Sequence, residues 1–188
     1  STAVLRASVS TGRVGRPSVV HRWDWNDLLM IHDEDDFLSM ATSSDGIHWT
    51  MLGNLQLGAD DNGYGAESQF SPTVLYDCIS GMEPSFHLWY SAESSNDGLS
   101  VDGEPRFAIV HATSPDGITW TPDPGGSGSH LVATEGTTWR SEIVEPTVTQ
   151  TASGEFLMVF VGINGESGER RLGMATSFDG SSWIVADD

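Results

Sequence analysis

The chain has 188 residues, of which 38% are hydrophobic and 19% charged, a composition typical of one globular domain and not of a disordered chain. It carries 27 Asp and Glu residues against eight basic residues, all of them Arg, which gives a net charge of −19. Because nucleic acids and anionic lipids are bound through basic side chains, neither is an expected partner.

Three kinds of element recur in the same order along the chain. An anchor of the form x-P-[ST]-V comes first, at 16–19, 71–74 and 145–148. Apolar runs of strand length follow, and they predict β-strands at 28–31, 86–90 and 156–161. A box of the form A-T-S-x-D-G-x-x-W ends each unit, at 41–49, 112–120 and 175–183. Six fixed positions matched three times identify an internal repeat.

The box itself predicts a tight turn. Asp followed by Gly between apolar stretches is a hairpin signal, because Gly takes positive φ and Asp bonds the backbone ahead of it. The Trp three residues after each Gly is expected to pack between neighbouring repeats. A further apolar run leads into each box, so each repeat predicts three strands, a tight turn and a fourth strand.

These repeats indicate an all-β fold, and four antiparallel strands per repeat are typical of a β-propeller blade. We expect one domain, 1–188, built from three blades near 13–58, 68–124 and 142–188. The segments 54–69 and 122–141 are rich in Gly, Asp and Ser and are expected to be loops. A β-sandwich is the alternative, although a sandwich does not require an identical turn box in each third.

Two stretches resemble a known superfamily. They read H-A-T-S-P-D-G-I-T-W-T, at 111–121, and W-R-S-E-I-V-E-P-T-V, at 139–148. With the anchors, they resemble the five-bladed propellers of the arabinanase/xylosidase, invertase and levansucrase superfamily. The sialidase Asp-box, S-x-D-x-G-x-x-W, separates Asp from Gly by one residue, whereas the two are adjacent here. A sialidase-like protein is therefore a minor alternative.

The resemblance implies action on glycosides by carboxylates at the starts of the inner strands, where the anchors fall. Glycoside hydrolysis needs a carboxylic acid to protonate the leaving oxygen and a carboxylate as base or nucleophile. The residues before the anchor prolines are Arg16, Ser71 and Glu145. Glu145 is the candidate general acid, and Glu142 and Glu67 are the candidate second carboxylates. Because only one of the three anchor residues is acidic, a non-catalytic carbohydrate-binding or scaffold propeller is the alternative function.

Further residues are candidates for binding carbohydrate. Trp23, Trp25 and Trp139 lie outside the repeated box, and aromatic faces of this kind stack on sugar rings. Arg140, which is adjacent to Trp139, is also a candidate for binding carbohydrate. Arg16 is a candidate for binding a carboxylate, unless it only offsets nearby negative charge.

No metal or cofactor is predicted. The six His residues show no zinc-ligand spacing, and no phosphate-binding loop or dinucleotide fingerprint is present in the sequence. The acidic run 33–36 lacks the glycine and the terminal Glu of a calcium loop and is expected to be a solvated turn. The single cysteine, Cys78, is expected to pack as a small hydrophobic residue.

The number of blades predicts an assembly. Closed propellers have four to eight blades, so three leave open faces unless the chain is part of a longer protein or a second chain covers them. Two copies give six blades, and we expect a homodimer whose stability rises with ionic strength, because salt screens the repulsion between acidic chains. No apolar run spans a membrane and no signal-peptide pattern opens the sequence, so the compartment is not predicted.

Overall fold

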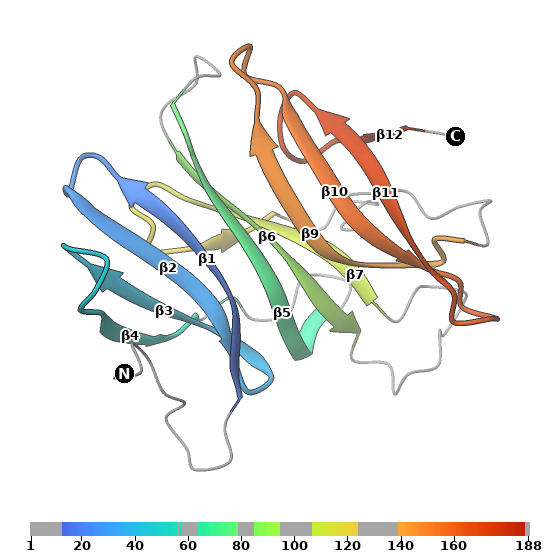
Figure 1. The fold of residues 1–188 in the computed structure, drawn as a ribbon, viewed down its shortest axis with the longest axis horizontal. Helices are drawn as coiled ribbons and strands as arrows, with labels where there is room; N and C mark the ends of the chain where they lie inside the picture. The colour runs from blue at the N-terminus through green and yellow to red at the C-terminus, as the bar shows by residue number, and fades with distance from the viewer. Residues whose placement is uncertain are drawn as a thin grey trace.

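The computed structural model describes residues 13–55, 57, 64–78, 85–94, 107–123 and 139–186, which form three four-stranded antiparallel sheets (Figure 1). Each sheet, or blade, is a meander of consecutive strands. Blade 1 contains β1 (Val14–Arg22), β2 (Asp27–Glu34), β3 (Phe37–Ser43) and β4 (Thr50–Asn54). Blade 2 contains β5 (Tyr64–Asp77), β6 (Ser85–Ser94), β7 (Phe107–Ser114) and β8 (Thr121–Pro122). Blade 3 contains β9 (Glu142–Gln150), β10 (Phe156–Ile163), β11 (Arg170–Ser177) and β12 (Ile184–Val185).

The predicted fold class is confirmed, with one strand longer than expected. Blade 2 begins at Tyr64, inside the segment 54–69 that the sequence predicts as a loop. The described residues form no helix that is long and apolar enough to cross a lipid bilayer. Cys78 is exposed, so the prediction that it packs as a small hydrophobic residue is wrong.

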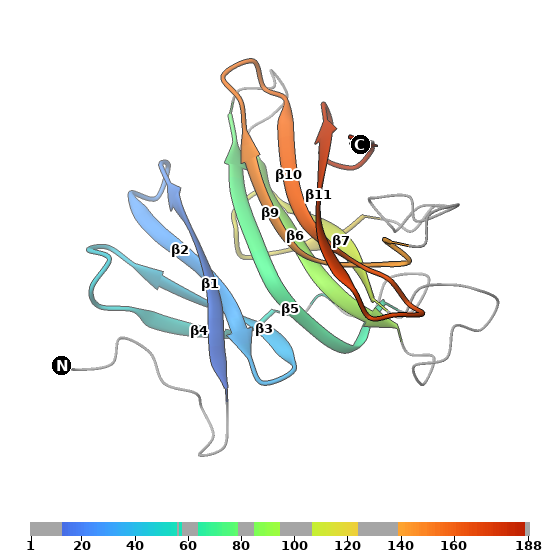
Figure 2. The same ribbon diagram turned by 45° about the vertical axis from the view of Figure 1, so that its right-hand side comes forward.

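The first strand of each blade lies beside the first strand of the next (Figures 1 and 2). Ser18 Oγ of β1 accepts a hydrogen bond from Val74 N–H of β5 at 3.0 Å. Thr73 Oγ1 of β5 donates to the Pro146 carbonyl oxygen of β9 at 2.7 Å. The Ser or Thr of the anchor motif therefore links neighbouring inner strands.

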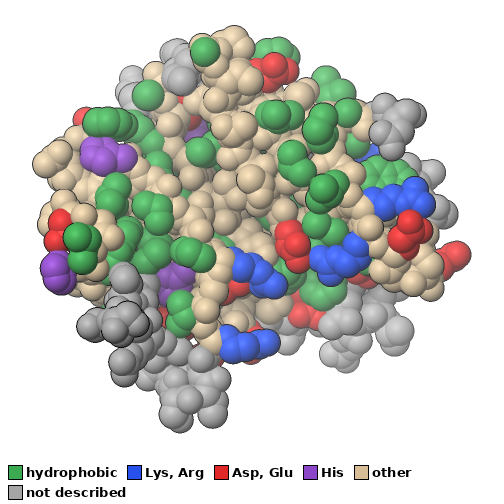
Figure 3. All heavy atoms as spheres, in the orientation of Figure 1, with side chains coloured by type: hydrophobic (Ala, Val, Ile, Leu, Met, Phe, Trp, Pro, Cys, Tyr) green, Lys and Arg blue, Asp and Glu red, His purple; other side chains and the backbone are tan. Residues whose placement is uncertain are grey.

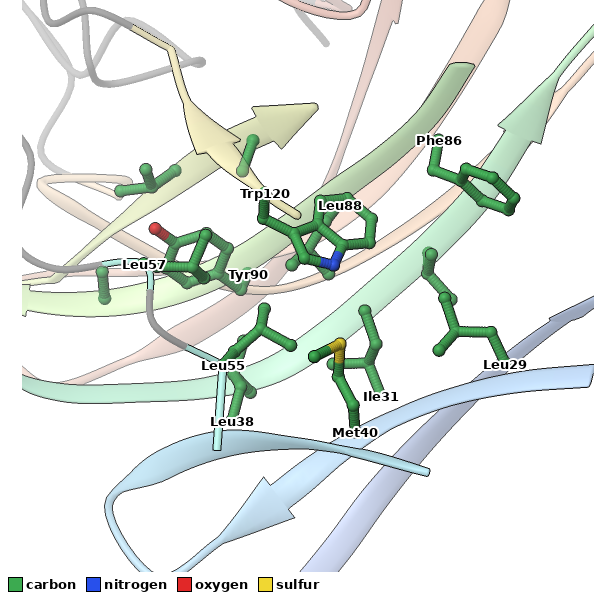
Figure 4. Packing of buried hydrophobic residues seen from close by; sticks show 14 of the residues in the cluster. Leu29, Ile31, Leu38, Met40, Leu55, Leu57, Phe86, Leu88, Tyr90 and Trp120 are labelled. Carbon is green, nitrogen blue, oxygen red and sulfur yellow. The ribbon is translucent and has the colours of Figure 1, made fainter. Parts of the chain in front are cut away.

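The hydrophobic core lies between the blades. Leu29 and Ile31 of β2 face Phe86, Leu88 and Tyr90 of β6 across the first interface (Figure 4). The second interface buries side chains of blades 2 and 3, namely Trp89, Ile109, Ile143, Val148, Phe156, Met158, Phe160 and Ala175. Each fully buried Val, Leu, Ile, Phe or Met side chain contributes about 1.5–3 kcal/mol. Interface packing therefore determines how the blades are oriented.

The repeated boxes form the predicted turns. The Asp45 carboxylate accepts hydrogen bonds from the N–H groups two and three residues ahead, at 2.8 and 2.7 Å. Asp116 and Asp179 repeat these bonds in the other two blades. The glycine of each box has positive φ, between 72° and 78°, which explains why Gly follows Asp in all three copies.

Two of the boxes also dock on the preceding blade. Arg22 Nη1 of blade 1 donates to the Asp116 carbonyl oxygen in the box of blade 2 at 3.1 Å. Trp89 Nε1 of blade 2 donates to the Gly180 carbonyl oxygen in the box of blade 3 at 2.9 Å. Each of these boxes therefore closes a turn and joins two blades.

The docking predicts unequal costs for two matched Gly→Ala substitutions. Gly117, in the blade 2 box, and Gly168, in the β10–β11 turn, both have a φ of 72°. A Cβ at Gly117 lies 3.0 Å from Leu29 Cδ2 and 3.3 Å from Arg22 Cδ, whereas a Cβ at Gly168 has no atom within 4 Å. We expect Gly168→Ala to cost about 1 kcal/mol of unfolding free energy and Gly117→Ala about 1–3 kcal/mol more. Denaturant titration measures both, and equal costs contradict the docking.

Candidate functional site

The three residues that precede the anchor prolines share an unusual backbone conformation. Arg16, Ser71 and Glu145 have φ values of 43°, 53° and 57°. Each lies where the pairing of the first and second strands shifts register, which is a β-bulge. Left-handed conformations of non-glycine residues cost about 1–3 kcal/mol each and cluster at functional sites. The same strain at three equivalent positions marks these bulges as the candidate site.

Side chains of the preceding blade hold two of the bulges. Ser71 N–H donates to Asp33 Oδ1 of β2 at 2.9 Å, and Glu145 N–H donates to Ser91 Oγ of β6 at 2.8 Å. Asp33 and Ser91 occupy equivalent positions, two residues beyond the pairing partner of the anchor Ser or Thr. The site is thus built across the blade interfaces.

The bulges surround an open pocket of about 550 Å³. Its lining comes entirely from the three inner strands, at 16–19, 71–75 and 145–148. A smaller pocket of about 430 Å³ adjoins it, because Arg16 lines both. Four residues contribute carboxylates to the smaller pocket, namely Asp33, Asp35, Asp36 and Glu93.

Two ion pairs balance charge at the pocket. Arg16 Nη1 lies 3.0 Å from Asp33 Oδ2, and Arg170 Nη2 lies 2.8 Å from Glu145 Oε1. Burial raises the pKa of Asp33, while the hydrogen bonds from Ser71 N–H and Arg16 act in the opposite direction. Glu145 is half-exposed, so a ligand entering the pocket reaches its carboxylate.

The structure places the other candidate carboxylates differently. Glu142 is half-buried at the first residue of β9, opposite Ile163, and it is not among the residues that line the pocket. Glu67 lies on β5, but its side chain is outside the described residues. Glu145 is therefore the one predicted carboxylate that the described structure places at the pocket.

Trp139 and Arg140 support the start of β9. The Trp139 ring stacks on Phe160, with ring centroids 6.3 Å apart, and it covers Gly162. Arg140 is buried, with its guanidinium 5.7 Å from the Trp139 ring, and its Nε and Nη1 atoms make no hydrogen bond to the residues that the structure describes. Neither residue lines the pocket formed by the described inner strands.

The structure places the candidates Trp23 and Trp25 away from this pocket. Both lie in the turn after β1, at the end of the strand opposite to Arg16, and Trp25 packs against Phe86. Because β1 rises about 3.3 Å per residue, roughly 20 Å of strand separates this turn from the bulge. These two rings therefore do not belong to the pocket that Glu145 lines.

Asp33 is the site residue that sequence reasoning missed. The run 33–36 is expected to be a solvated turn, but Asp33 and Glu34 belong to β2 and are buried. A period-2 signal was present, because Leu29, Ile31 and Asp33 alternate along one face of the strand. The prediction is correct only for Asp35 and Asp36, which are exposed in the turn.

A second polar cluster lies at the other end of blade 2, beside an open pocket of about 830 Å³. His87 Nδ1 is 2.9 Å from His111 Nε2, and His111 Nδ1 is 2.7 Å from Asp123 Oδ2. Ser181 Oγ of blade 3 donates to Asp123 at 2.7 Å, so the cluster joins blades 2 and 3. In the described part of the chain, no three His, Cys, Asp or Glu side chains are arranged to hold a metal ion.

This cluster predicts acid sensitivity. Burial, together with repulsion from His111, lowers the pKa of His87 to about 4, below the value of about 6.5 in the unfolded chain. The folded state therefore favours neutral His87, and this contribution is lost as the pH falls from about 6.5 to about 4. We expect stability to fall by on the order of 3 kcal/mol across this range.

Thermal unfolding at several pH values measures the fall. His87→Gln is expected to reduce it, because the substitution removes the group whose protonation the folded state disfavours. A pH dependence identical in wild type and His87→Gln contradicts the assignment.

No family model and no curated protein matches the sequence. Solved structures do match the fold. A thermostable family-43 glycoside hydrolase has 16% identity and a TM-score of 0.66, over 95% of this chain and 55% of its own. Zg3597, a family 117 glycoside hydrolase from the marine bacterium Zobellia galactanivorans, has 14% identity and a TM-score of 0.71, over 94% of this chain and 56% of its own. Sucrose-6-phosphate hydrolase from Lactobacillus gasseri has 12% identity and a TM-score of 0.68, over 92% and 33%.

These structures are five-bladed β-propeller glycoside hydrolases, which confirms the predicted resemblance in fold. The chain, with its three sheets, spans about half the length of the first two.

Proposed function

We propose that the pocket at the three bulges binds carbohydrate and that Glu145 acts there as the general acid of glycoside hydrolysis. The observation that carries the proposal is the shared strain at Arg16, Ser71 and Glu145, which directs three equivalent positions to one pocket. The likeness in fold to propeller glycoside hydrolases supports the choice of ligand.

Glu145 fits the proposed role in position and accessibility. A general acid must reach the leaving oxygen of the glycoside, and Glu145 is half-exposed at the pocket. Its partner Arg170 is also half-exposed, so substrate can displace this guanidinium without breaking buried contacts. Hydrolysis also needs a second carboxylate, for which Glu142 and Glu67 remain the proposed residues.

A non-catalytic carbohydrate-binding propeller is the second candidate function. Arg16 and Ser71 occupy the positions equivalent to Glu145, and neither side chain can serve as a base or nucleophile in the manner of a carboxylate. This observation favours binding without turnover.

Glu145→Gln distinguishes the two functions when it is assayed on a panel of aryl furanosides and pyranosides. The amide keeps the shape of the side chain but has no acidic proton to donate, so we expect the rate to fall about 10²–10⁴-fold. Glu155→Gln is the matched control, because Glu155 lies in the β9–β10 turn at the opposite end of the blade. Equal rates in all three proteins contradict the role of Glu145, and sugar binding without turnover supports the second function.

We also propose that the chain forms a homodimer through its open blade faces. On blade 3, Leu172, Met174 and Ile184 are exposed on strands that face no further sheet in the described structure. On blade 1, Leu52 of β4 and Ile47 of the β3–β4 turn are also exposed. Apolar surface of this kind favours association, which the acidic charge opposes until salt screens it.

Light scattering across a salt series tests the dimer. We expect the dimer fraction to rise with salt, and Leu172→Asp to weaken association at least tenfold by introducing a charge at the interface. Trp23→Asp is the control, because Trp23 is similarly exposed but lies in the β1–β2 turn. A well-folded monomer at every salt concentration shows that the prediction is wrong.

A further inference from the structure

We propose that the carbohydrate of this pocket carries an acidic group, a carboxylate or a sulfate ester, and that Arg16 binds it. This inference rests on the proposed carbohydrate-binding function and names the class of sugar. It follows from where the arginines lie, how Arg16 is held, and which of its donors are unused.

The arginines gather at the end of the blades where the bulges lie. Of the six arginines among the described residues, five belong to this end, namely Arg13, Arg16, Arg140, Arg170 and Arg171. Figure 3 shows guanidinium groups, in blue, close together on one part of the molecular face and interspersed with carboxylates. In a chain of net charge −19, this end of the blades holds most of the positive charge of the described residues.

Two of the carboxylates near the proposed ligand are neutralised by ion pairs. Asp33 is paired with Arg16 and Glu145 with Arg170, each within 3.0 Å, whereas Asp35, Asp36 and Glu93 also line the smaller pocket beside Arg16. Asp33 is also largely shielded from solvent, while the side chain of Arg16 is 54% exposed. A ligand in the pocket therefore meets the cation of this pair before its anion.

The structure holds Arg16 in place before any ligand binds. Its guanidinium bonds to Asp33 and lies 5.5 Å from the centre of the Phe70 ring. A single acceptor oxygen is enough to bond the bulge N–H, because Ser91, at the equivalent position in blade 2, bonds Glu145 N–H with its hydroxyl. Asp33 bonds Ser71 N–H with one carboxylate oxygen and has a second oxygen to spare. The extra carboxylate oxygen of Asp33 is the one that binds Arg16, which makes Asp33 a positioning residue for it.

Arg16 offers unused hydrogen-bond donors to the pocket. It bonds Asp33 through Nη1, and its Nε and Nη2 atoms make no hydrogen bond to the described residues. A planar guanidinium matches the two oxygens of a carboxylate. The unused donors of Arg16 can therefore bind an acidic group of the ligand.

Binding of paired sugars tests the proposal. Galacturonic acid is compared with galactose, glucuronic acid with glucose, and glucose 6-sulfate with glucose, by NMR titration of the full chain. We expect at least one acidic sugar to bind at least tenfold more tightly than its neutral counterpart, because charge-assisted hydrogen bonds are about twice as strong as neutral ones. The carboxylate and sulfate arms show which acid the pocket prefers.

Two arginine variants locate the effect. Arg16→Gln is expected to abolish the preference for the acidic sugar while neutral sugars still bind. Arg171→Gln is the matched control, because Arg171 is equally exposed at the same end but pairs with Glu169 and does not line the pocket. In Asp33→Ser, the new hydroxyl is expected to accept the hydrogen bond from Ser71 N–H, as the Ser91 hydroxyl does from Glu145 N–H. Because Arg16 then loses its carboxylate partner, we expect the preference for acidic over neutral sugar to decrease.

The outcomes separate this inference from the proposed function. Equal affinity for acidic and neutral sugars, or a preference that survives Arg16→Gln, overturns the inference and leaves carbohydrate binding standing. Failure of the wild-type chain to bind any sugar overturns both. Near-ultraviolet circular dichroism confirms that each variant is folded, so loss of the preference in folded Arg16→Gln alone supports the assignment.

Discussion

The backbone N–H groups of Ser71 and Glu145 are bonded by side chains that the preceding blade supplies, Asp33 and Ser91. Both N–H groups belong to strained residues, and a strained conformation persists only where its surroundings determine it. The shape of the pocket, its ion pairs and the orientation of the bulge side chains all depend on these two hydrogen bonds. Function and blade packing are therefore linked, because a bulge cannot form correctly unless its neighbour is docked.

The opposite end of each interface is held by the repeated box. Arg22 and Trp89 bond carbonyl oxygens of the boxes in blades 2 and 3, while the apolar core fills the space between. Each interface is thus fixed at both ends, by a box at one and by a bulge at the other. This arrangement explains why the anchor and the box occur together in the repeats of blades 2 and 3.

The sequence predicted the fold well because the features that determine it are local. The Asp–Gly turn, the strand-length apolar runs and the repeat are all properties of neighbouring residues, and the three sheets confirm them. The site was predicted only in part, because it depends on contacts between repeats. Nothing local shows that Asp33 of blade 1 reaches Ser71 of blade 2.

The most direct test of this account is hydrogen exchange of the Glu145 amide in Ser91→Ala. Removing the Ser91 hydroxyl deletes the acceptor 2.8 Å from Glu145 N–H and leaves the bond between Ser71 N–H and Asp33 in place. We expect exchange of the Glu145 amide to accelerate at least tenfold, while that of the Ser71 amide stays unchanged. Unchanged exchange at Glu145, or equal acceleration at both amides, contradicts the claim that each bulge is held by its own neighbouring blade.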